Sequence, residues 1–171
     1  FFLNPQMGNE FKPLLAQWHV SVEDAVIIDP VLRLFQGPTL GVEPVVNTFA
    51  AHEITRSLQQ QSAQVVFPLT RPIRAATDTP AGVQAMELAK TSDAGWAESD
   101  IMTVFSQGAA ELDPNTDIKG PVPVAVAVKV RKATDASDED EKDVSASETR
   151  IVAFGSIAFA QNRDVEASVF N

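Results

Sequence analysis

The sequence predicts an α/β domain whose central strands are buried on both faces. Helical and extended patterns alternate along the chain, and residues 122–130 and 150–160 are largely apolar at both odd and even positions. A strand of this kind is typical of a sheet covered on both faces, as in parallel α/β folds. The 171 residues, 44% of them hydrophobic, are enough for one domain with a substantial core.

The first third of the chain contains the predicted helices. Residues 11–18 and 52–61 carry apolar side chains at helical spacing. Between them, residues 25–30 ("AVIIDP") predict a short buried strand that ends at Asp29, and residues 36–44, with two glycines and two prolines, predict a loop.

The remaining elements are predicted to be mostly extended. Residues 63–76 contain Pro68 and Pro72, which place this segment at a sheet edge or make it irregular. Residues 82–88 predict a further strand, and the last buried strand ends at Gly155.

A long acidic segment separates the two buried strands. Residues 131–149 are rich in Asp, Glu, Ser and Ala, which predicts a long hairpin loop, solvated and mobile over about residues 134–147. The alternative is a cation site, but an EF-hand loop requires a glycine at its sixth position and this segment has none.

The overall charge restricts the partners. The net charge is −10, with 13 basic against 23 acidic residues, so binding to nucleic acid is not expected. No run of 18 apolar residues occurs, so a link to the membrane would come only from segments outside this chain. The ends, "FFLNPQ" and "RDVEASVFN", resemble the end of a strand and the start of a helix. We therefore expect residues 1–171 to be a single domain excised from a longer protein.

Candidate catalytic groups are few. The chain has no cysteine, which excludes a thiol nucleophile and thiolate metal sites. Ser156 follows the last buried strand, but "FGSIAF" does not match the G-x-S-x-G pattern of a nucleophile elbow. A serine triad would need His19 or His52, for which structural roles are favoured. Neither a metal site nor a cofactor is predicted.

Two further groups are candidates for contact with a ligand or partner. Arg56 and Arg71, with Arg74, could form a basic patch, although salt bridges to the many carboxylates are the favoured interpretation. The second group is the stretch "TSDAGWAESD", which surrounds Trp96 with Ser92 and Glu98. We interpret it first as a structural corner with Trp96 buried in a turn, second as a contact with a ligand or partner, and last as a catalytic site.

Six segments resemble the auxiliary proteins of ABC-type transport systems, a family that includes the gliding-motility auxiliary component. These segments are "KPLLAQWHVSVEDAVIID", "FAAHEITRSL", "VVFPLTRPI", "LAKTSDAGWAESD", "KGPVPVAVAV" and "RIVAFGSIAFAQN", in family order. Two positions depart from the family pattern. Glu53 replaces the usual proline, and Ser156 with Ile157 stands where acidic residues are frequent.

The resemblance implies a three-layer sheet, flavodoxin-like or similar to glutamine amidotransferases, in a periplasmic or extracytoplasmic domain tethered to the inner membrane. It also implies a non-catalytic accessory or binding function beside ABC permease and ATPase subunits. The alternatives are a hydrolase or transferase that uses Ser156 or the Ser92–Glu98 corner, and a carbohydrate or peptide binder with Trp18 and Trp96 in an aromatic cleft.

Overall fold

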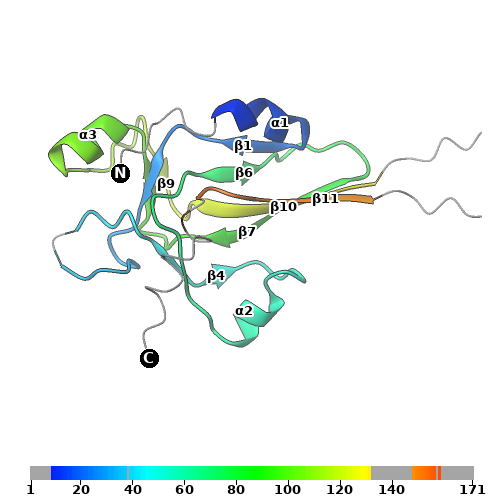
Figure 1. Ribbon diagram of the computed structural model, residues 1–171, viewed down its shortest axis with the longest axis horizontal. Helices are drawn as coiled ribbons and strands as arrows, with labels where there is room; N and C mark the ends of the chain where they lie inside the picture. The colour runs from blue at the N-terminus through cyan, green and yellow to red at the C-terminus, as the bar shows by residue number, and fades with distance from the viewer. Residues whose placement is uncertain (1–8, 38, 132–147, 157, 159–171) are drawn as a thin grey trace, which may run out of the picture.

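The computed structural model describes residues 9–37, 39–131, 148–156 and 158, and it is mostly β (Figure 1). Strands account for 35% and helices for 17%, and the strands form several small antiparallel sheets. The predicted three-layer α/β fold, flavodoxin-like or similar to glutamine amidotransferases, is therefore wrong.

In chain order the elements are η1 (Asn9–Phe11), α1 (Lys12–Gln17), β1 (Val20–Val22), β2 (Val26–Ile28), β3 (Val45–Val46), β4 (Thr48–Phe49), α2 (Arg56–Gln60), β5 (Val65–Val66), β6 (Ile73–Ala75), β7 (Val83–Lys90), β8 (Trp96–Glu98), α3 (Ile101–Gln107), β9 (Ile118–Lys119), β10 (Pro123–Arg131) and β11 (Glu148–Phe154).

The largest sheet has the strand order β11-β10-β7-β4, and every neighbouring pair is antiparallel. A second sheet has the order β2-β8-β9, and two strand pairs, β1-β6 and β3-β5, complete the arrangement. Figure 1 shows α1 beside β1, α2 beside β4, and α3 at the end of the molecule near β9. Strands β10 and β11 pair as neighbours, as the predicted hairpin requires.

The correction to the fold class follows from what covers β10. Val126 and Val128 pack in a cluster with Val20 of β1 and Ile73 of β6. Ala125 and Ala127 belong to a different cluster, which includes residues of β2, β3 and β8. Because side chains alternate along a strand, β10 is buried on both faces by other strands and loops. Burial on both faces of a strand therefore does not reveal whether its neighbours run parallel or antiparallel to it.

The helices are too short to form the outer layers of an α/β fold. Helices α1 and α2 contain no buried residue, and α3 buries only Val104. None of the helices in the described ranges is long and apolar enough to cross a membrane.

Most of the individual elements predicted from the sequence are confirmed at their positions. Helices α1 and α2 lie within the predicted helical segments, and β2, β7, β10 and β11 overlap the predicted strands. The sequence reasoning did not identify β1, β3, β4, β8, β9 or α3. The predicted strand at the N-terminus, the acidic segment over 132–147 and the predicted helix at the C-terminus lie outside the described residues.

Candidate functional site

The polar centre of the molecule is Asp29, a fully buried residue directly after β2. Its Oδ1 accepts hydrogen bonds from the backbone N–H groups of Val31 at 3.0 Å and Leu32 at 2.8 Å. Its Oδ2 accepts from the N–H of Ser92 at 3.0 Å. A buried carboxylate requires such partners, because burial removes it from water. Asp29 therefore holds the turn after β2 and links it to the segment after β7.

Close backbone approach around Asp29 requires glycine at Gly95 and Gly120, in addition to Gly41, whose added Cβ would lie 2.3 Å from the Asp29 carbonyl oxygen. A Cβ on Gly95 would lie 2.8 Å from Thr91 Oγ1 and 3.3 Å from Asp29 Oδ2. A Cβ on Gly120 would lie 2.3 Å from the carbonyl oxygen of Gly95. The 2.8 Å and 2.3 Å distances are steric clashes. A residue with a side chain at Gly95 or Gly120 would therefore push these segments apart.

The "TSDAGWAESD" stretch joins this centre to β8, the middle strand of the β2-β8-β9 sheet. Thr91 is buried, and its Oγ1 accepts from the N–H of Val122 at 2.9 Å and donates to the carbonyl of Ser92 at 3.1 Å. The Oγ of Ser92 is itself buried, without a hydrogen-bond partner. The predicted structural corner is therefore present, and its hydrogen bonds connect β7 to the start of β10.

Trp96 differs from its prediction in two ways: it lies in β8 rather than in a turn, and it is half-buried rather than buried. The indole packs against the cluster of Val26, Ile28 and Val104. Its Nε1–H donates to Glu98 Oε2 at 3.3 Å, since residues i and i+2 of a strand share a face. Glu98 is buried, and its Oε1 accepts from the N–H of Asp100 at 3.0 Å.

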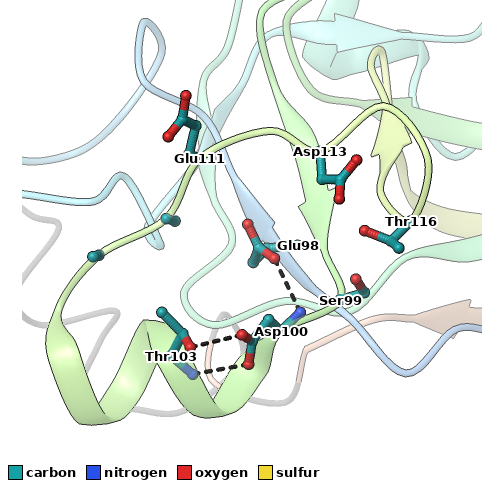
Figure 2. A pocket seen from close by; sticks show the side chains of 9 residues that line it. Glu98, Ser99, Asp100, Thr103, Glu111, Asp113 and Thr116 are labelled. Carbon is teal, nitrogen blue, oxygen red and sulfur yellow. Dashed lines mark hydrogen bonds between the residues drawn. The ribbon is translucent and has the colours of Figure 1, made fainter.

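Glu98 lies at the inner wall of an open acidic hollow of about 530 Å³ (Figure 2). The residues that line this hollow are Glu98, Ser99, Asp100, Thr103, Ala109, Ala110, Glu111, Asp113 and Thr116. Figure 2 shows the Asp100 carboxylate turned onto the first turn of α3, where it caps the helix. It accepts from the Oγ1 of Thr103 at 2.6 Å and the N–H of Thr103 at 3.0 Å, and these bonds lower the pKa of Asp100.

Three of the carboxylates that line the hollow, those of Glu98, Asp100 and Asp113, accept hydrogen bonds from local donors. Asp117, which is not a lining residue, accepts from the Oγ of Ser99 at 2.8 Å and from the N–H of Asp113 at 2.8 Å. In the part of the chain that the structure describes, no group of three or more His, Cys, Asp or Glu side chains is placed to hold a metal ion. The acidic hollow can attract a cationic group, but its geometry is that of a capped helix and an ordered loop.

Ser156 is buried and bonded to the main chain. Its Oγ donates to the carbonyl of Pro68 at 2.7 Å and accepts from the N–H of Ala158 at 3.1 Å. His52 Nδ1 accepts from the N–H of Ile54 at 3.2 Å, so the ring caps its own turn. Among the described residues, neither bond of Ser156 is to a general base, so no serine triad is assembled here.

The three arginines do not form a common patch. Arg71 forms an ion pair with Asp24, donates from Nε to the carbonyl of Glu23 at 3.0 Å, and donates to Asn9 Oδ1 at 3.2 Å. Arg74 lies in β6. Arg56 begins α2 and lines a groove on the opposite side of the large sheet. The favoured interpretation, salt bridging, is thus confirmed for Arg71.

The structure brings Ser92, Trp96 and Glu98 to one corner, and places Arg56, Arg71 and Ser156 elsewhere. Sequence reasoning missed Asp100 and the acidic hollow. A signal was present, because Asp100 precedes the apolar Ile101 and Val104, and Gly108 follows the last residue of α3 in the left-handed conformation. This is the usual pattern of a helix with an aspartate N-cap and a glycine C-cap.

Comparison of the chain with models of known protein families, with curated proteins and with solved structures finds no match.

Proposed function

We propose that this domain is a non-catalytic accessory module of an ABC-type transport system, and that it works outside the cytoplasm by contact with the permease of an assembly that also contains an ATPase. The observation that supports the proposal is that the polar side chains at the strand ends form structural hydrogen bonds to the main chain. The Asp29 carboxylate, the Ser156 hydroxyl and the Thr91 hydroxyl all bond to main-chain groups that join separate segments.

This arrangement suits a rigid binding platform better than an active site. A nucleophile needs a base within hydrogen-bond reach and an accessible pocket. The Ser156 proton is directed at the Pro68 carbonyl, and the side chain is buried. Neither Trp18 nor Trp96 lines the acidic hollow or the groove that Arg56 lines, so these two hollows give no support to an aromatic sugar-binding cleft. The sequence motifs then favour the transport accessory over the two alternatives.

The proposal is tested by isolating the full-length protein from its native membrane. A tagged protein extracted in mild detergent should carry a permease and an ATPase in near-stoichiometric amounts, identified by mass spectrometry. Recovery of the protein alone from intact membranes would refute the proposed function.

A further inference from the structure

A second hollow, which we call the sheet groove, lies over one face of the large sheet. It has a volume of about 910 Å³ and is lined by residues from the turn before α2 and from β7, β10 and β11. Met86 and Val152 both lie opposite Ala127 in the register of the sheet, so the three side chains share one face. Met86 is 42% exposed, Val152 39% and Ile54 46%. The floor of the groove is therefore apolar and open to solvent.

Cations surround this apolar floor. Arg56, Lys129 and Arg150 line the sheet groove, and Glu53 is the single carboxylate among its lining residues. This balance is opposite to that of the whole chain, which carries a net charge of −10.

Glu148 of β11 only partly offsets these cations. Its carboxylate is 2.7 Å from the Nζ of Lys129, 2.5 Å from the Nε of Arg150 and 3.3 Å from the Nε of Arg131. The hydrogen bond from Lys129, followed by that from Arg150, lowers the pKa of Glu148 to about 2. Three cations thus share the Glu148 carboxylate, Glu53 also acts electrostatically on Arg150, and the Arg150 side chain remains 71% exposed. The positive charge at this end of the groove is available to a further anion.

We propose that the sheet groove binds an acidic segment of a partner protein, with a large apolar side chain over Met86 and Val152 and carboxylates directed at Arg56, Lys129 and Arg150. Charge complementarity selects an acidic ligand, and the exposed apolar floor selects one with a hydrophobic anchor. A protein segment is favoured over an anionic membrane, because the apolar floor lies inside a groove of about 910 Å³, which the side chains of a single extended segment can enter and a flat bilayer surface cannot. This inference rests on the proposed function in so far as the segment would belong to the transport assembly.

The test uses the 171-residue chain and a fluorescein-labelled nonapeptide that alternates glutamate with leucine. Fluorescence anisotropy should report saturable binding that weakens when the glutamates are replaced by glutamine or the leucines by alanine. Arg150→Glu should weaken binding by about fivefold, because it replaces an attraction with a repulsion of similar size. Arg150→Gln, which removes the charge alone, should have a smaller effect in the same direction. Lys119→Glu, an exposed cation of β9 outside the groove, is the matched control and should leave binding unchanged.

The apolar floor has its own matched pair. Met86→Ser should weaken binding of the peptide, whereas Met102→Ser, at an exposed methionine of α3 outside the groove, should not. Thermal unfolding of each variant must match the wild-type chain for its binding result to count. Unchanged binding in folded Arg150→Glu and Met86→Ser variants would overturn the proposal.

Two other occupants give distinct results, and each would also overturn the proposal. Binding to vesicles of phosphatidylserine and phosphatidylcholine that is lost in Arg150→Glu, without binding to the peptide, would assign the groove to a membrane surface. Tighter peptide binding after deletion of residues 134–147 would assign it to the acidic segment of this chain. Failure of this proposal and failure of the proposed function give different results. If only the groove proposal fails, a permease still co-isolates with the Arg150→Glu protein. If only the proposed function fails, the peptide still binds the domain but no permease co-isolates with it.

Discussion

Asp29→Ala should be among the most destabilising substitutions in this domain. The change removes the acceptor for three main-chain donors, the N–H groups of Val31, Leu32 and Ser92, in hydrogen bonds that are partly buried. A buried donor left without a partner costs about 1–3 kcal/mol of stability, and hydrogen bonds to a charged acceptor contribute more than hydrogen bonds between neutral groups. Allowing for partial relaxation of the turn after β2, we expect a loss of about 3–6 kcal/mol in the free energy of unfolding.

Urea unfolding followed by tryptophan fluorescence measures this loss directly. A small domain is stable by about 5–15 kcal/mol, so the variant should unfold at a much lower urea concentration or be unfolded in water. Asp29→Asn keeps one acceptor oxygen and should lose less. Asp78→Ala is the control, because Asp78 is exposed and its change should stay within about 0.5 kcal/mol of the wild type. If Asp29→Ala were as stable as Asp78→Ala, the reasoning about the buried carboxylate would be wrong.

Three further substitutions test other parts of the structure. Trp96→Ala should lower the free energy of unfolding, measured in urea, by about 2–4 kcal/mol, which is less than the loss for a fully buried tryptophan. Trp96→Phe should recover most of this loss. A negligible loss in the alanine variant would contradict the packing of the indole. Glu148→Gln should reduce the acid sensitivity of unfolding. The folded-state pKa of Glu148 is depressed from 4.5 to about 2, so the Glu148 carboxylate contributes stability above pH 4.5 that is lost as the pH falls toward 2. Urea midpoints at a series of pH values should therefore show the two proteins converging below pH 4.5, and parallel curves would refute the ion-pair assignment. Ser156→Ala should remain folded, with a loss of about 1–2 kcal/mol from the unmet Pro68 carbonyl, and the wild-type serine should not react with a fluorophosphonate probe.

Local structure was largely predictable from the sequence. The helical spacing over residues 11–18 corresponds to α1, and the apolar run before Asp29 corresponds to β2. The apolar character of residues 122–130 correctly indicated a strand buried on both faces, and the composition of the chain correctly indicated a substantial core. These properties depend on neighbouring residues and on the alternation of side chains, which are visible along the chain.

The candidate site was only partly predictable. The "TSDAGWAESD" corner does join Ser92, Trp96 and Glu98, but its connection to Asp29 spans 63 positions and could not be read from spacing. The sheet groove likewise combines Arg56 with Arg150, which lie 94 positions apart in the sequence. In contrast, the capped start of α3 at Asp100 had a local signal that was overlooked.

The direction and partners of the strands were decided only by the tertiary structure. An apolar strand gains the same burial whether a helix or another strand covers it, so the pattern of β10 is compatible with a parallel α/β sheet and with the observed antiparallel one. The outcome depended on β1 and β6 packing against Val126 and Val128, while residues of β2, β3 and β8 packed on the other face. The sequence by itself therefore determined where the longest strands lie and that the central one is buried. Long-range packing decided what buries it, because hydrophobic burial is non-directional and leaves no record in the sequence of which segment makes the contact.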